Sequence, residues 1–169
     1  MKIVIQKVTS AQVRLSQDVP AQDNPRTPES AVDSPDSRRI SLGFVLLVAV
    51  ADSDGRAEAA WAAKKIAHLR VFEDNHGKMN LSILDVVGQI LSISQFTLFA
   101  DISRGNRPSF VKAGHKEHAE KMWQEVNQIL QSDYHIPVKT GWFGAHMEVD
   151  LVNDGPVTIL LDTEQDMPH

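Results

Sequence analysis

Several stretches of the chain alternate apolar with polar residues, and this two-residue period predicts β-strands. Residues 3–15 show it first, with apolar Ile3, Ile5, Val8, Val13 and Leu15. A more continuous apolar run over residues 40–50 indicates a second, more deeply buried strand, and residues 89–100 carry a third strand pattern. Alternation returns in residues 146–152, HMEVDLV, and the last strand is expected in residues 157–163, VTILLDT.

Two segments have the three- and four-residue spacing of helices that pack on a sheet. In residues 56–70 the apolar stripe consists of Ala59, Ala62, Ala63, Ile66 and Leu69, and the acidic residues of Asp52-Ser53-Asp54 are suited to cap this helix. In residues 113–131 the stripe consists of Ala119, Met122, Trp123, Val126, Ile129 and Leu130. Strands outnumber helices and do not alternate regularly with them, so we predict an α+β fold with a largely antiparallel sheet and two main helices.

Residues 17–39 interrupt this pattern, because they hold four of the eight prolines, many Asp, Ser and Asn residues, and almost nothing to bury. We expect a mobile insertion in the outer hairpin, either a tolerated surface loop or a partner-binding segment. A length of 169 residues with 42% hydrophobic content fits one domain over residues 1–169, with a short tail after residue 162.

Charge and cysteine content limit the function classes. The formal net charge is -5, which argues against a broad phosphate-binding surface, so any nucleic-acid contact is expected to be local. No cysteine is present, which excludes disulfides, thiolate nucleophiles and sulfur-liganded zinc sites. The start of the chain is not a signal-peptide pattern, and no apolar run reaches the roughly 20 residues that span a bilayer. We expect a soluble, cytoplasmic protein with no membrane contact.

Two features invite a chemical interpretation. Seven histidines are present, but His115 and His118 lie among charged residues that predict a solvated helix face, and we expect no metal site. In SISQFTLFA, residues 92–100, an extended strand would place polar groups on both faces. These groups either bond to neighbouring backbone at a sheet edge or line a pocket floor.

A Gly-Pro pair interrupts the last two strand patterns in NDGPVT, residues 153–158. Proline has no N–H for a sheet ladder, and glycine weakens a strand interior. Gly155 and Pro156 therefore form a plain turn, or their main chain itself has a role.

Taken together, SQFTL at residues 94–98 and NDGPVT resemble the two signature motifs of D-aminoacyl-tRNA deacylases, formerly called D-tyrosyl-tRNA deacylases. Three further segments are similar to family sequence in the same order: IQKVTSA near the start, RVFEDNHGKMNLS from residue 70, and RPSF from residue 107. The resemblance covers nearly the whole chain except residues 17–39 and the tail after residue 162.

The resemblance implies a barrel-like homodimer with its active site at the subunit interface. It implies that Gly155 and Pro156 are joined by a cis peptide bond and reach into the partner's site as a chiral filter that rejects L-aminoacyl esters and lets glycine pass. Lys7, Asn153 and Thr158 are the matching supporting residues. Family members commonly carry arginine where this chain has Lys7, so the hold on the Gly-Pro loop is expected to be looser here.

By the same resemblance, the SQFTL segment receives the 3′-terminal adenosine and the ester of D-aminoacyl-tRNA. The matching residues are Ser94, Gln95, Phe96 and Thr97, with Phe96 or its backbone serving the adenine. The sequence places no base beside Thr97, so we favour hydrolysis assisted by the ribose 2′-OH, with no metal or organic cofactor. Arg104, Arg107 and Lys112 are candidates for a small basic patch near the CCA end.

Two other functions remain open from the residues alone. The first is a non-catalytic module that binds RNA 3′ ends through the same pocket. The second is a small-molecule esterase that uses Ser94 or Thr97.

Overall fold

The computed structural model describes residues 1–16 and 38–168 of the chain. The predicted insertion at residues 17–39 therefore lies outside the described residues, except for its last two. Of these, Arg39 begins a short strand, β2 (Arg39–Ile40).

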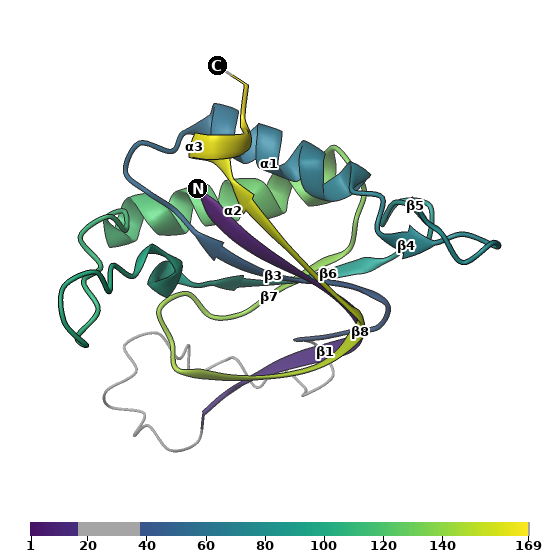
Figure 1. Ribbon diagram of the computed structural model, residues 1–169, viewed down its shortest axis with the longest axis horizontal. Helices are drawn as coiled ribbons and strands as arrows, with labels where there is room; N and C mark the ends of the chain where they lie inside the picture. The colour runs from purple at the N-terminus through teal and green to yellow at the C-terminus, as the bar shows by residue number, and fades with distance from the viewer. Residues whose placement is uncertain (17–37, 169) are drawn as a thin grey trace.

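A six-stranded sheet forms the body of the protein, with β1 at its centre (Figure 1). Besides β2, its strands are β1 (Lys2–Leu15), β3 (Gly43–Ala49), β6 (Gln89–Ser94), β7 (Val138–Thr140) and β8 (Met147–Asp162). β1 pairs with β3 along its first half and with β2 further on, while β8 pairs along its other edge. Because β1 and β8 are long and curve together, the sheet wraps into a partly closed barrel.

The sheet is mixed. All pairs that involve β1 are antiparallel, as expected for a largely antiparallel sheet, but β3–β6 and β6–β7 are parallel. Parallel neighbours need a long crossover connection, and the two main helices supply it. The chain passes through α1 (Arg56–His68) between β3 and β6, and through α2 (Lys116–Ser132) between β6 and β7. The α+β class with two main helices is confirmed.

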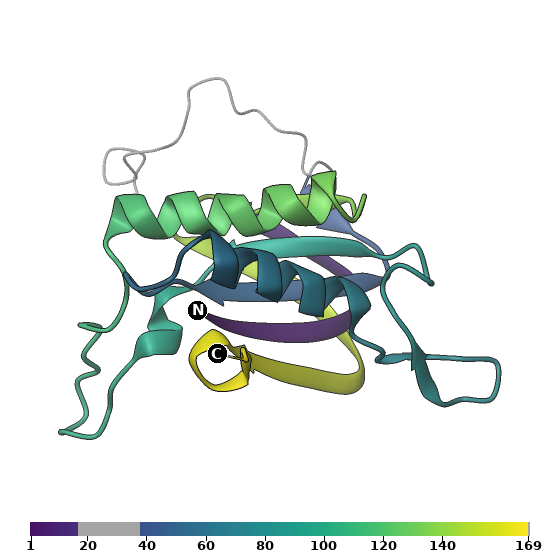
Figure 2. The same cartoon turned by 90° about the horizontal axis from the view of Figure 1, so that it is seen from above.

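Both helices lie side by side on one face of the sheet (Figure 2). The predicted stripes face the core: Ala59, Ala62, Ala63 and Ile66 of α1 are fully buried, as are Val126 and Leu130 of α2. Leu69 follows the end of α1 and is only partly buried. On α2, Trp123 also has a polar link to the sheet, because its indole Nε1 donates to Ser92 Oγ at 2.9 Å.

The predicted helix starts need correction. The residue that precedes α1 is Gly55, whose N–H donates to Glu58 at 2.7 Å, so the Asp52–Asp54 segment does not cap the helix. α2 begins at Lys116 rather than near residue 113. The Gly114 N–H donates to Val50 O at 2.8 Å, just after β3, so Gly114 is bonded to the sheet side and not to the helix.

Asp54 instead joins the first and last strands. Its Oδ1 accepts from the Met1 ammonium at 2.5 Å, with the Asp54 side chain 4% exposed. The Thr163 hydroxyl lies 3.2 Å from the same oxygen, at the start of the one-turn helix α3 (Thr163–Asp166) that occupies the predicted tail.

The remaining elements are small. β4 (Phe72–Glu73) and β5 (Met79–Leu81) form a separate hairpin that extends from the body. None of the described helices is long and apolar enough to cross a membrane.

Candidate active site

The SQFTL segment lies where two parallel strands end. β6 stops at Ser94, and residues 96–99 form a 3₁₀ turn, η2 (Phe96–Phe99). The prediction of a strand through residue 100 was therefore wrong beyond Ser94. The chain leaves the strand at Gln95, where ψ is 75° and the N–H still bonds to Val48 O at 2.7 Å. Loops beyond the carboxyl ends of parallel strands are common ligand sites in α/β sheets.

A cavity of about 610 Å³ opens at this point, and we call it the Ser94 pocket. Three of the four predicted residues line it, namely Ser94, Gln95 and Phe96. The other lining residues come from β6, the end of β3 and the residue after it, the segment before α2, the first turn of α2, the segment before β8 and the start of β8: Ile93, Val48, Ala49, Val50, Phe110, Ala113, Gly114, Lys116, Ala119, Phe143, Gly144, Ala145, His146, Met147 and Val149.

The walls of the Ser94 pocket are largely apolar and aromatic. Phe96 and Phe110 meet edge to face, with ring centroids 5.1 Å apart, and Phe143 faces them from the segment before β8. Phe96 is 55% exposed, so its ring is available to a ligand. A partly exposed aromatic ring is typical of sites that stack unpaired bases.

Thr97 does not line the pocket, although it is bonded to Gln95, which does. Its Oγ1 accepts from Gln95 Nε2 at 2.5 Å. Within the described residues, no hydrogen bond joins this hydroxyl to a histidine or a carboxylate. Such a hydroxyl lacks the adjacent base that an attacking nucleophile needs.

Lys116 and His146 are pocket residues that the sequence reasoning missed. Lys116 begins α2 and His146 precedes β8, so nothing in their local sequence links them to SQFTL. Only the fold brings these segments together. Among the residues the structure describes, no group of three or more His, Asp or Glu side chains is arranged to hold a metal ion.

The Gly155–Pro156 pair lies within β8, and its peptide bond is cis. Gln6 pairs with Thr158 and Val8 with Asn153, so four residues of β8 lie opposite Lys7 alone. The Gly-Pro segment forms a bulge, where Gly155 has a φ of 116° that favours glycine. Both residues are exposed, and neither lines the Ser94 pocket of its own chain.

The supporting residues predicted with this pair lie around the bulge. Lys7 is 4% exposed, and its Nζ lies 3.0 Å from Asp154 Oδ2, next to Gly155. Thr158 donates its hydroxyl to Gln6 Oε1 at the C-terminal end of the bulge, and Asn153 pairs with Val8 at its N-terminal end. A buried lysine is therefore paired with the carboxylate that precedes the Gly-Pro pair.

The charged residues near the pocket are mostly exposed. Arg104, Arg107 and Lys112 lie on the loop between η2 and α2, and none of them lines the pocket. At the start of α2, the backbone N–H and the ring of His115 both bond to the Asp52 carboxylate at 2.7 Å. The backbone bond is the main cause that lowers the pKa of Asp52, with the ring adding to it.

The whole chain resembles known proteins. A relative from Bifidobacterium longum subsp. infantis, named D-aminoacyl-tRNA deacylase, is 54% identical over 99% of this chain and 98% of its own length. Another of the same name from Bifidobacterium adolescentis is 51% identical over 98% of each chain.

Two solved structures share the fold. The c-Myc DNA unwinding element binding protein has a TM-score of 0.78 at 35% identity, over 96% of this chain and 98% of its own. A probable eukaryotic D-amino acid tRNA deacylase has a TM-score of 0.70 at 13% identity, over 95% of this chain and 97% of its own. At this identity the likeness bears on the fold alone. The D-Tyr-tRNA(Tyr) deacylase family model matches residues 4–162, and the chain belongs to that family.

Proposed function

We propose that this protein hydrolyses the ester of D-aminoacyl-tRNA, and of glycyl-tRNA, to release the free amino acid and tRNA. The observation that carries the proposal is the position of Ser94, Gln95 and Phe96 at the floor of an aromatic pocket, in a chain of this family. The 3′-terminal adenosine would stack against the aromatic walls, with its ester over the turn that follows Ser94.

The chemistry fits assistance by the substrate. Ester hydrolysis needs an activated water and stabilisation of the developing oxyanion, and main-chain N–H groups of the turn after Ser94 are candidates for the second task. The Thr97 hydroxyl is bonded to Gln95 and has no base beside it. The ribose 2′-OH next to the ester is then the group best placed to activate water, while the protein positions the ester.

A second copy of the chain would complete the site. Gly155 and Pro156 lie on an exposed bulge away from the Ser94 pocket of their own chain, so they can serve as a filter only in another copy. The same strand exposes apolar side chains, with Leu160 at 74% and Val152 at 56%. Exposed apolar side chains along one strand are suited to a contact between subunits. In the dimer, the Gly-Pro main chain would occupy the space that an L side chain needs.

The activity is tested by parallel deacylation time courses on D-Tyr-tRNA and L-Tyr-tRNA. We expect hydrolysis of the D ester and survival of the L ester, because the filter rejects the L side chain. Hydrolysis of neither ester, with tRNA still bound, would favour the non-catalytic RNA-binding alternative. Equal hydrolysis of both would remove the filter role from Gly155 and Pro156.

Thr97→Ala tests the assistance by the substrate. We expect turnover close to that of the wild-type protein, because the hydroxyl has no activating base. A substrate that ends in 2′-deoxyadenosine, with its ester on the 3′ oxygen, should react slower by about 10²-fold, the lower end of general acid–base contributions. A covalent acyl-enzyme trapped in the wild type, together with complete loss in Thr97→Ala, would contradict this mechanism.

Lys7→Arg tests whether the pair between Lys7 and Asp154 holds the Gly-Pro bulge in place. Arginine adds a planar, two-pronged hydrogen-bonding group to the pair with Asp154, so we expect the ratio of D to L hydrolysis to rise by a factor of about three to ten, the equivalent of one net hydrogen bond. Lys2→Arg is the matched control, because Lys2 also pairs across β1 and β8, with Asp162 at 3.5 Å, but far from the bulge. An unchanged ratio in Lys7→Arg would exclude this role.

Leu160→Glu tests the dimer. A charge on this exposed position should weaken the contact between copies, so sedimentation should show a shift from twice the chain mass toward one, together with loss of deacylation. Val87→Glu is the control, since Val87 is 84% exposed on the loop before β6, away from β8. A wild-type protein that is active as a monomer would refute the shared site.

A further inference from the structure

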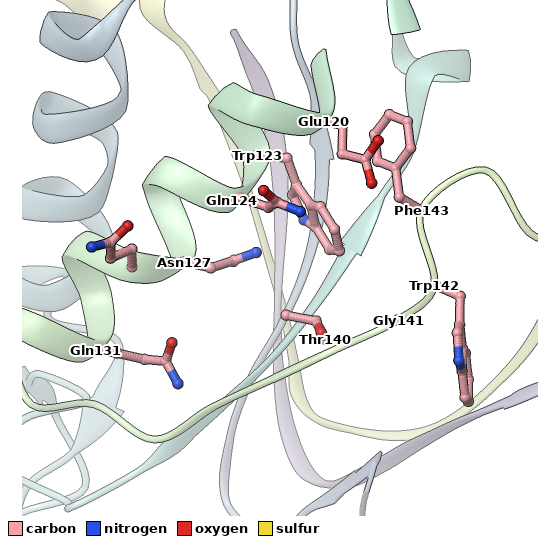
Figure 3. Close-up of a pocket in the computed structure, with 10 residues that line it drawn as sticks. Glu120, Trp123, Gln124, Asn127, Gln131, Thr140, Gly141, Trp142 and Phe143 are labelled. Carbon is pink, nitrogen blue, oxygen red and sulfur yellow. The ribbon is translucent and has the colours of Figure 1, made fainter. Parts of the chain in front are cut away.

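A second cavity, of about 400 Å³, lies between α2 and the segment that follows β7, and we call it the α2 pocket (Figure 3). One side is formed by residues of α2, including Trp123, Gln124, Asn127 and Gln131. The other side is formed by residues 140–143. Its volume falls within the range of small-molecule sites.

Asn127 is the unusual residue of this pocket. The residue is 5% exposed, and neither its Oδ1 nor its Nδ2 has a hydrogen-bond partner within the described structure. Figure 3 shows its side chain extending from α2 into the space in front of Thr140. Buried amides almost always have partners, because an unpaired one loses its bonds to water without replacement. An unpaired amide at the floor of a cavity therefore points to a ligand that supplies the missing partners.

The neighbours of Asn127 do not supply them. The Trp123 indole already donates to Ser92, and Gln131 Nε2 donates to Val138 O at 3.3 Å. The buried indole Nε1 of Trp142, on the opposite side of the pocket, is also without a partner. Gln124, Gln128 and Gln131, which also line the pocket, are exposed to solvent.

These groups define the chemistry of the ligand. A carboxamide offers one acceptor beside one donor, which matches the edge of a nucleobase, where a donor and an acceptor also lie side by side. Trp123 and Phe143 provide aromatic walls for a planar ring, whereas the Trp142 ring is stacked with the Arg38 guanidinium at 3.3 Å. The lining residues include no Lys or Arg, and Glu120 is the only charged one among them; the nearby Arg38 guanidinium is held by Thr140 O at 2.9 Å and by the Trp142 ring. The pocket is therefore suited to a base, with its phosphate left outside.

The position of the pocket suggests which base it takes. Phe143 lines both the α2 pocket and the Ser94 pocket, so the two cavities are neighbours that share this residue. We propose that the α2 pocket binds the base of the nucleotide that precedes the terminal adenosine of the tRNA, through the Asn127 amide. This inference rests on the proposed function, because it takes the terminal adenosine to occupy the Ser94 pocket.

The first test measures binding without catalysis. Calorimetry would compare the dinucleotide cytidylyl-adenosine with an analogue whose first nucleotide lacks its base, and with free cytidine. We expect the intact dinucleotide to bind about tenfold more tightly than the abasic analogue, in the range of one bidentate base contact. Equal binding of these two would overturn the inference. Free cytidine binding as tightly as the dinucleotide would also overturn it, because the pocket would then be a nucleoside site independent of the tRNA.

Asn127→Leu removes both hydrogen-bonding groups at nearly constant volume. We expect the preference for the intact dinucleotide over the abasic analogue to disappear. The hydrolysis of a D-aminoacyl ester of free adenosine, which lacks the preceding nucleotide, should stay unchanged. The melting temperature should stay the same or rise, because the variant no longer buries an unpaired amide. A fall in melting temperature with the preference retained would show a purely structural role and contradict the proposal. Asn75→Leu, the same change on an exposed turn, is the control.

The two proposals can fail separately. Hydrolysis of D esters together with equal binding of the two dinucleotides would leave the proposed function standing and overturn the α2 pocket. If the protein hydrolyses no D ester but prefers the intact dinucleotide in an Asn127-dependent way, the proposed function fails and the base site stands as part of an RNA 3′-end binding surface.

Discussion

The pairing of β1 with β8 is the interaction on which both parts of the proposed site depend. β8 runs antiparallel to β1 over nearly its whole length, and the register shifts only around Val8. At that shift the extra residues of β8 form the bulge that presents Gly155 and Pro156. Since β1 also pairs with β3, the same strand holds the framework from which the Ser94 pocket is built. The buried Lys7 lies between the residues where the first of the two register shifts occurs, and it pairs with Asp154 of the bulge.

The sheet separates two tasks by the direction of its strands. The antiparallel part carries the Gly-Pro bulge, where exposed main chain is the feature that matters. The parallel part, β3 and β6, ends at one edge and leaves room for a pocket beyond it. Both proposed tasks rest on the placement of main chain and aromatic rings. This agrees with a site that works by positioning and exclusion.

Charge is used sparingly in both cavities. The protein carries a net charge of -5, yet the Ser94 pocket includes Lys116, and the α2 pocket is lined mainly by amides and aromatic rings. A surface of this kind is suited to recognise the end of an RNA through its bases and sugars rather than through a long run of phosphates. Phe143, in the segment before β8, lines both cavities and so connects the two proposed binding sites.

The sequence by itself determined the main strands and the two main helices, the core stripes of both helices and, through two short motifs, the family. Alternation and helical spacing are local properties, so they can be read without the fold. The sequence did not reveal the end of β6 at Ser94, because an apolar run such as FTLF suits a strand and a 3₁₀ turn equally. The parallel pairs, the position of Lys116 in the pocket and the unpaired amide of Asn127 were decided by tertiary structure alone. Each of them depends on contacts between segments far apart in the chain, and such contacts leave no local pattern.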